Sequence, residues 1–90
     1  MKISDVKIRR IYPDGKLRAI VSVTLDGQFV IHDIKIISME DKTFVAMPSR
    51  RDETGRFRDI VHPLNAETRS EMENAILEGY KALLPQFSEL

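Results

Sequence analysis

Four arginines lie within nine residues in a polar stretch just past the midpoint of the sequence, namely Arg50, Arg51, Arg56 and Arg58. Arginine suits phosphate groups because its planar guanidinium makes two parallel charge-assisted hydrogen bonds. Phe57 lies among these arginines and offers a ring on which a nucleic-acid base can stack. The residue types and spacing therefore indicate a loop, Ser49–Arg58, that binds a nucleic-acid backbone.

A second basic pair, Arg9 and Arg10, lies near the N-terminus and extends the candidate site if both groups share one surface. The sequence leaves that placement open. It also leaves open a purely structural interpretation, in which Asp52, Glu53 and Asp59 neutralise the neighbouring arginines as surface ion pairs.

Residues that could support catalysis or metal binding are sparse. His32 and His62 lie thirty residues apart, and a closed metal site needs three or four ligands. Ser49 has no general base nearby that would activate it as a nucleophile. We therefore expect no catalytic residue, no metal and no cofactor, and we interpret each histidine as a strand-associated residue satisfied by hydrogen bonds.

The composition is that of an ordinary globular protein rather than a disordered one, with 42% hydrophobic and 31% charged residues. Its 90 residues predict a single domain over 1–90, because domains typically run to about 100–150 residues. No apolar run approaches the ~20 residues of a membrane helix. There is no cysteine and no signal-peptide pattern, so a cytoplasmic protein without membrane contact is expected.

Hydrophobic residues alternate with polar ones over the first two-thirds of the sequence, which predicts strands over about residues 3–61. Pro13-Asp14-Gly15 and Asp26-Gly27 are turn signals, and the second is typical of a type I′ hairpin. The predicted strands include 17–25, 29–37, 43–47 and 57–61, with a solvated loop over 49–56. Apolar residues on both faces of 29–37 indicate that both sides of this strand are covered, which favours a central position in the sheet or an interface.

The period then changes to a helical one over 66–84, where Met72, Ile76 and Tyr80 recur at intervals of four. Asn65 is a candidate N-cap, and Gly79 within the helix indicates close packing. We expect Pro85 to end the helix and leave a short tail over 85–90. The fold class is therefore α+β, an antiparallel meander of four or five strands followed by one long helix. One helix covers one face of such a sheet, which favours a homodimer through the remaining face or an edge.

An ordered series of short motifs resembles the SpoVG family over roughly residues 3–80. The motifs are Val6-x-Ile8-Arg9-Arg10, Arg18-Ala19-Ile20, Thr24-Leu25-Asp26, Phe29-Val30, His32-Asp33-Ile34, Phe44-Val45-Ala46-Met47-Pro48-Ser49, Gly55-x-Phe57-Arg58-Asp59-Ile60, His62-Pro63, Asn65 and Thr68-Arg69.

The resemblance implies a dimeric α+β protein that binds DNA and RNA and regulates many genes without catalysis, with links to septum formation and, in spore formers, to sporulation. It also implies that Arg50 and Arg51 are contacts to nucleic acid. A different interpretation stays open, in which the protein is an adaptor that binds cell-division or regulatory proteins and has no specific nucleic-acid site. Salt distinguishes the two, because phosphate contacts release counterions and weaken steeply with salt.

Overall fold

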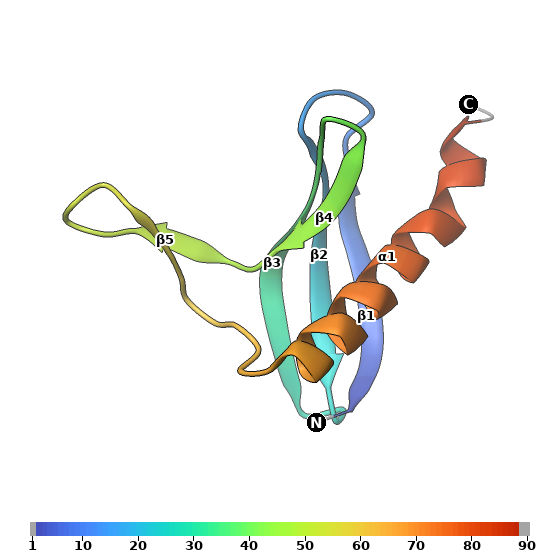
Figure 1. The fold of residues 1–90 in the computed structure, drawn as a ribbon. Coiled ribbons are helices and arrows are strands. Elements are labelled where there is room, and N and C mark those ends of the chain that lie inside the picture. The colour runs from blue at the N-terminus through green and yellow to red at the C-terminus, as the bar shows by residue number, and fades with distance from the viewer. Residues whose placement is uncertain (1, 89–90) are drawn as a thin grey trace.

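The computed structural model describes residues 2–88 of the chain, and side chains over residues 2–83. The elements in chain order are β1 (Ile3–Ile11), β2 (Leu17–Leu25), β3 (Phe29–Met39), β4 (Lys42–Ala46), β5 (Ser49–Arg51), β6 (Phe57–Asp59) and α1 (Ala66–Ser88). The first four strands form one antiparallel meander in the order β1-β2-β3-β4, while β5 and β6 pair separately (Figure 1). The predicted α+β class with a meander and one C-terminal helix is confirmed.

Tight turns with positive φ angles connect the strands of the meander. Asp26 and Gly27 have φ angles of 52° and 64°, as the predicted type I′ hairpin requires. Glu40 and Asp41 repeat this geometry between β3 and β4, with φ angles of 49° and 68°. These turns fix the strand register, so that one face of the sheet becomes continuously apolar.

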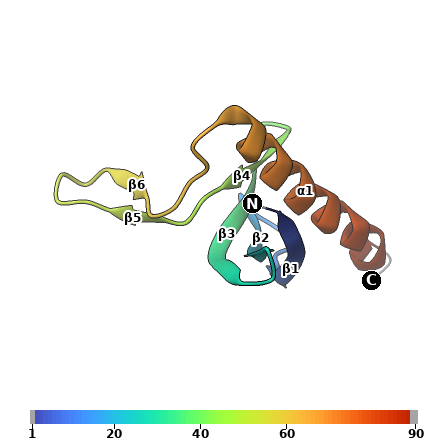
Figure 2. The ribbon, with the colours of Figure 1, turned by 90° about the horizontal axis from the view of Figure 1, so that it is seen from below.

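Helix α1 runs diagonally across this apolar face, and within residues 2–88 no helix covers the opposite face (Figures 1 and 2). The predicted stripe of Met72, Ile76 and Tyr80 is buried against the sheet, and Ile76 has no exposed surface. The sheet contributes the remaining buried core: Ala19, Val21, Val23, Leu25, Ile34, Ile36, Val45 and Met47. A second copy of the helix would be needed to bury the other face in the same way.

Two local predictions about the helix are confirmed. The Oδ1 atom of Asn65 accepts a hydrogen bond from the backbone N–H of Thr68 at 2.8 Å, so Asn65 caps the helix. Gly79 packs against β1, because a Cβ atom at this position would lie 3.4 Å from Cγ1 of Val6. The helix therefore begins and docks as the sequence indicated.

Several predicted element bounds are wrong. The predicted strand 43–47 lies one residue earlier, at Lys42–Ala46, and the predicted strand 57–61 ends at Asp59. The helix continues through Pro85 to Ser88, whereas the sequence predicted its end at 84. A proline removes one donor and crowds one carbonyl, which a helix tolerates more easily in its last turns than in its middle. The predicted tail therefore shrinks to residues 89–90, which lie outside the described residues. The predicted loop 49–56 is also partly strand, because Ser49–Arg51 pairs with Phe57–Asp59.

The central position predicted for strand 29–37 is confirmed, because β3 lies between β2 and β4, but the start of the strand is not covered on both sides within one chain. Ile34 and Ile36 are fully buried, yet Phe29 and Val30 are 66% and 45% exposed. Strand β3 also runs two residues further than predicted, to Met39. Among the described residues, no side chain buries this exposed end of the strand.

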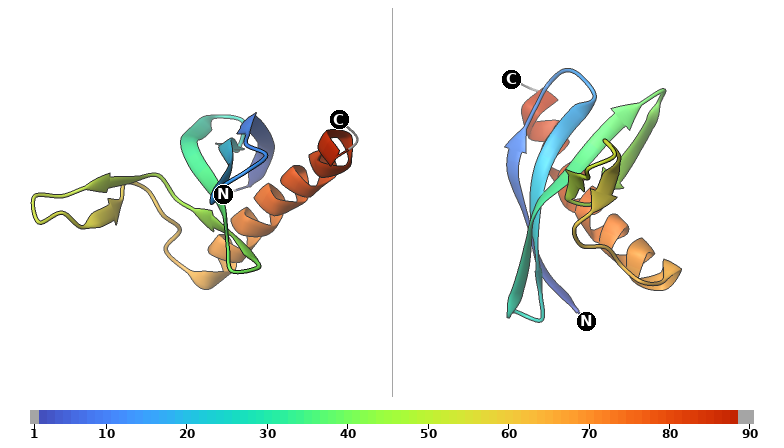
Figure 3. Two further views of the ribbon diagram at one scale, coloured as in Figure 1. Left: turned by 90° about the horizontal axis from the view of Figure 1, so that it is seen from above. Right: turned by 90° about the vertical axis from the view of Figure 1, so that its left-hand side faces the viewer.

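Hairpin β5–β6 stands away from the four-stranded sheet as an arm (Figure 3). All six residues of its two strands are exposed. The arm leaves the sheet after β4 and returns through residues 60–65 to the start of α1 (Figure 1). This arm carries the arginine cluster.

Candidate nucleic-acid interface

The register of the β5–β6 arm decides where each arginine lies. Arg50 is opposite Arg58, and Arg51 is opposite Phe57. Because successive side chains of a strand alternate between faces, Arg50 and Arg58 share one face of the arm, and Arg51 and Phe57 share the other. The side chains of the predicted anchors Arg50 and Arg51 therefore leave the backbone on opposite faces of the arm.

The Asp52 carboxylate organises the tip of the arm. Its Oδ1 atom accepts hydrogen bonds from the Thr54 hydroxyl at 2.6 Å and from the backbone N–H groups of Thr54 and Arg56. Its Oδ2 atom accepts the Nε–H of Arg58, also at 2.6 Å. The hydrogen bond from the Thr54 hydroxyl, followed by that from Arg58, lowers the pKa of Asp52 from 3.8 to about 2.

The four arginines of the arm differ in the partners that their guanidinium groups contact. Arg58 is ion-paired with Asp52, so the structural interpretation of acidic neighbours holds for this one arginine. The Arg51 guanidinium lies 5.2 Å from the centroid of the Phe57 ring, a cation–π geometry. Among the described side chains, Arg50 and Arg56 have no ion pair. The arm thus carries two charges without an acidic partner and one charge seated on an aromatic ring.

Arg9 and Arg10 lie elsewhere, on β1 of the four-stranded sheet. They line a shallow surface pocket of about 430 Å³ together with Ile20, Ser22, His32 and Asp33. The pocket on the arm, also about 430 Å³, is lined by a separate set: Arg50, Arg51, Asp52, Glu53, Arg58, Asp59 and Ile60. Within one chain the two basic groups therefore line two separate pockets.

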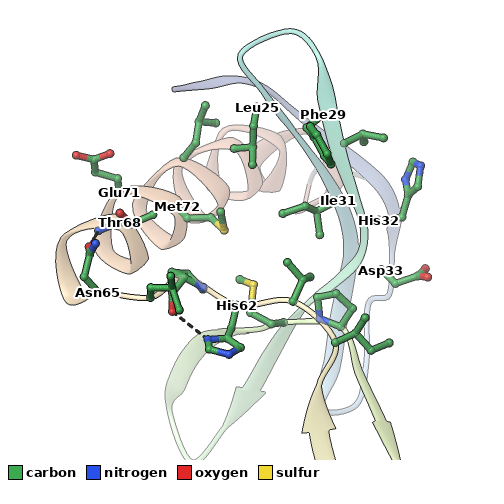
Figure 4. Close-up of a pocket in the computed structure, with 18 residues that line it drawn as sticks. Leu25, Phe29, Ile31, His32, Asp33, His62, Asn65, Thr68, Glu71 and Met72 are labelled. Atoms are coloured by element: carbon green, nitrogen blue, oxygen red, sulfur yellow. Dashed lines mark hydrogen bonds between the residues drawn. The ribbon is translucent and has the colours of Figure 1, made fainter. Parts of the chain in front are cut away.

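Sequence reasoning missed an apolar groove of about 710 Å³ between the start of α1, the residue 60–65 segment and the β2–β3 turn (Figure 4). Large apolar side chains at its rim are exposed, with Leu64 at 91%, Ile60 at 67% and Phe29 at 66%. The sequence signal was the presence of Ile60 and Leu64 in a segment with too few apolar residues to bury them. Exposed apolar surface of this kind marks an interaction site.

The two histidines lie in different surroundings. Nδ1 of His32 is 2.8 Å from the Ser22 hydroxyl oxygen on the open face of the sheet. Nδ1 of His62 donates to the Pro63 carbonyl oxygen at 3.1 Å (Figure 4). Within the described part of the chain, no group of three or more His, Asp or Glu side chains could hold a metal ion. No helix over residues 2–88 has the length and apolar character needed to cross a membrane.

Comparison with known proteins identifies relatives along most of the chain. A family model described as SpoVG matches residues 1–82. "Putative septation protein SpoVG" of Acetivibrio thermocellus is 54% identical over 83 residues, which cover 92% of this chain and 88% of the relative. The protein of the same name from Desulforudis audaxviator is 56% identical over 81 residues, covering 90% and 92%. That from Clostridium novyi is 53% identical over 83 residues, covering 92% and 83%.

Proposed function

This chain belongs to the SpoVG family, and from that premise we propose that it is a non-enzymatic regulator that binds DNA and RNA through its β5–β6 arm. The relatives carry the name of septation proteins, so the proposed regulation concerns septum formation and, where the organism forms spores, sporulation. The proposal places the protein in the cytoplasm and involves no cofactor.

The observation that carries the proposal is the exposed arm with arginines on both of its faces. Arg50 has no acidic partner among the described side chains, and Arg51 lies over the Phe57 ring. A phosphate can therefore reach Arg50 from one side, while a base can stack beside Arg51 on the other. Phosphate contacts carry no base information, so binding through the arm is expected to be tolerant of sequence.

A homodimer is part of the proposal. Leu64 and Ile60 expose apolar surface that a monomer has no reason to keep, and their groove is lined mostly by uncharged residues. A small chain buries a limited fraction of its surface, so association between copies supplies apolar burial that the fold lacks. Two copies present two arms, and two weak nucleic-acid sites then act together when one strand spans both.

The same groove also favours a second candidate function, an adaptor that binds cell-division or regulatory proteins. Its mouth is rimmed by Leu64, and its floor includes Met47 and Met72, side chains that adapt to varied apolar partners. In this alternative the arm is a contact for proteins, and nucleic acid binds only incidentally.

A salt titration separates these candidates. Fluorescence anisotropy with labelled DNA and RNA of matched sequence would be measured from 50 to 300 mM salt. The proposed function predicts that log K falls linearly with log salt, by about 0.9 per phosphate contact on duplex DNA and about 0.7 on single strands. Absence of binding, or binding with no salt dependence, would overturn the nucleic-acid function and favour the adaptor.

A further inference from the structure

Two β-bulges flank the central strand β2 at the same level of the sheet. On one side, the register between β1 and β2 slips between Ile8 and Arg10, so Arg9 is an extra residue in β1. On the other side, the register between β2 and β3 slips opposite Ser22, between Val21 and Val23. Bulges re-aim side chains and are common beside functional sites. Here both bulges border one pocket, that of Arg9, Arg10, Ile20, Ser22, His32 and Asp33, which we call the bulge pocket.

The bulge in β3 places the first and last residues of the segment 31–34 on the core face of the sheet and the two residues between them on the opposite face. Ile31 packs against the core and Ile34 is fully buried in it. The two residues between them, His32 and Asp33, both point away from the core side (Figure 4). This arrangement requires Asp33 to adopt a φ angle of 62°, a left-handed conformation that non-glycine residues rarely adopt. A strained backbone position of this kind is characteristic of functional sites.

A chain of hydrogen bonds orients the cationic side of the bulge pocket. Nε of Arg9 donates to the Ser22 hydroxyl oxygen at 3.1 Å, and that oxygen lies 2.8 Å from Nδ1 of His32. Ser22 is only 4% exposed, whereas Arg9 and His32 are exposed. The Ser22 hydroxyl therefore holds both Arg9 and Nδ1 of His32, while Nε2 of His32 has no hydrogen bond among the described residues. The terminal nitrogens of Arg9 likewise remain available.

We propose that the bulge pocket binds one nucleotide unit of RNA, with a backbone phosphate on Arg9 and His32 and the adjacent ribose 2′-hydroxyl on Asp33. Arg10 adds positive charge beside the phosphate. Ser22 is a positioning residue. Its hydroxyl hydrogen-bonds Arg9 and His32 and so orients both side chains, while Ser22 itself is buried and does not contact the ligand. The inference rests on the proposed function, since it assigns a second, RNA-selective site to a nucleic-acid-binding protein.

Asp33 is the residue that makes the pocket selective for RNA. Asp33 lines both the bulge pocket and the neighbouring apolar groove, and it has no ion pair among the described side chains. A carboxylate accepts hydrogen bonds but repels a phosphate, so it suits a hydroxyl donor placed next to the phosphate. The 2′-hydroxyl is the group that distinguishes RNA from DNA. A DNA strand leaves Asp33 without a donor and retains its repulsion.

The test compares the unmodified protein with Asp33→Asn, using single-stranded RNA and DNA of the same sequence. Asparagine adopts the left-handed conformation readily, so this variant preserves the bulge. The proposal predicts several-fold tighter binding of RNA than of DNA by the unmodified protein. Asp33→Asn keeps one acceptor oxygen for the 2′-hydroxyl but removes the charge that repels DNA, so the ratio should fall, and Asp33→Gly, which tolerates the positive φ and has no acceptor, should bring the ratio near one. Lys42→Ala, which removes an exposed charge on β4 outside the pocket, should leave the ratio unchanged.

Further variants test the cationic side. Arg9→Ala should weaken RNA binding about fivefold or more. Ser22→Ala should weaken RNA binding by a similar factor, and Ser22→Thr should restore it, since the hydroxyl returns. If Ser22→Ala lowers only the thermal stability, its positioning role is overturned.

The outcomes separate this inference from the proposed function. Equal binding of RNA and DNA by the unmodified protein, or a preference that Asp33→Asn leaves intact, overturns the bulge pocket alone. The arm remains supported in that case if Arg50→Ala/Arg51→Ala weakens binding. No binding of either nucleic acid by the unmodified protein overturns both.

Discussion

Nε of Arg58 donates to Oδ2 of Asp52 at 2.6 Å, on the face of the arm where Arg58 lies opposite Arg50. Like charges directly opposite one another destabilise a strand pair. The Asp52 carboxylate compensates one of the two charges, so the pair of strands can form while Arg50 stays free. The arm therefore holds its shape without giving up the charge that the proposed function needs.

The first prediction compares Arg50 with Arg58. Arg50→Ala should weaken binding of DNA and RNA about fivefold to tenfold, because it removes an uncompensated phosphate contact. The double variant Asp52→Asn/Arg58→Ala removes one charge of each sign and keeps the Oδ1 atom that holds the turn. It should bind within about twofold of the unmodified protein in the same anisotropy assay. A larger loss in the double variant than in Arg50→Ala would show that Arg58 is the principal contact.

The second prediction concerns pH. The pKa of Asp52 is lowered from 3.8 to about 2, so the carboxylate stabilises the arm fully above pH 3.8, and this contribution is lost as the pH falls through about 2. NMR amide shifts of Thr54 and Arg56 should therefore stay constant from pH 7 to about 4 and change with a midpoint near 2. Asp52→Asn should lack this transition. A midpoint at the ordinary carboxyl value would contradict the hydrogen-bonded turn.

Local sequence signals predicted the meander and the docked helix well. The dipeptide Asp26-Gly27 predicted the type I′ turn correctly, because few residues tolerate the positive φ angles that this turn requires at both positions. Ile76 and its neighbours at intervals of four marked the buried stripe. The predicted helix end at Pro85 was wrong. Proline in a helix carries an energetic cost but does not forbid the helix, and this helix continues past Pro85.

The third prediction tests the helix cap. Asn65→Ala should lower the free energy of unfolding by about 1 kcal/mol, because the Thr68 N–H loses its side-chain acceptor. Asn65→Asp, which keeps an acceptor oxygen and adds a favourable charge at the helix N-terminus, should retain or raise stability. Urea denaturation followed by circular dichroism measures both variants. Equal stability of Asn65→Ala and the unmodified protein would show that the cap contributes nothing.

The fourth prediction concerns Gly79. A Cβ atom there would make an ordinary contact with Val6 at 3.4 Å, so Gly79→Ala should stabilise the helix by up to about 1 kcal/mol and raise the Tm by several degrees. Gly79→Leu should instead lower the Tm, because the larger side chain cannot fit against β1. Thermal denaturation of the two variants shows whether the contact between the helix and β1 has room for a Cβ atom or is overpacked by it. A Tm lowered by alanine would mean that the helix and β1 cannot separate by even a few tenths of an ångström.

The fifth prediction tests the apolar groove as a dimer interface. Leu64 is 91% exposed in one chain, so Leu64→Asp should not disturb the core but should shift the protein towards monomer in sedimentation equilibrium. Met39→Asp is a matched control, since Met39 is an exposed apolar residue of β3 that lies outside the groove. A monomeric unmodified protein, or a Leu64→Asp variant that remains dimeric, would contradict this interface.

The sequence predicted which residues form the candidate site on the arm but not how their side chains are arranged. The arginine cluster was evident from residue types, but the opposite orientation of Arg50 and Arg51 depends on the pairing of two three-residue strands. Strands that short carry no periodic signal. The bulge pocket was less visible still, because His32 meets Ser22 and Arg9 only through long-range strand register. The spacing of residues along the sequence does not predict where a β-bulge shifts the register between two strands.

The most direct test of the central claim is a charge-matched comparison of two double variants at two salt concentrations. Arg50→Ala/Arg51→Ala and Lys16→Ala/Lys42→Ala each remove two exposed positive charges, but only the first pair lies on the arm. If nucleic acid binds through the arm, the arm variant should lose at least tenfold in affinity at low salt and show a shallower salt dependence, whereas the lysine variant should stay close to the unmodified protein. Equal affinities and equal slopes for the two variants would contradict binding through the arm.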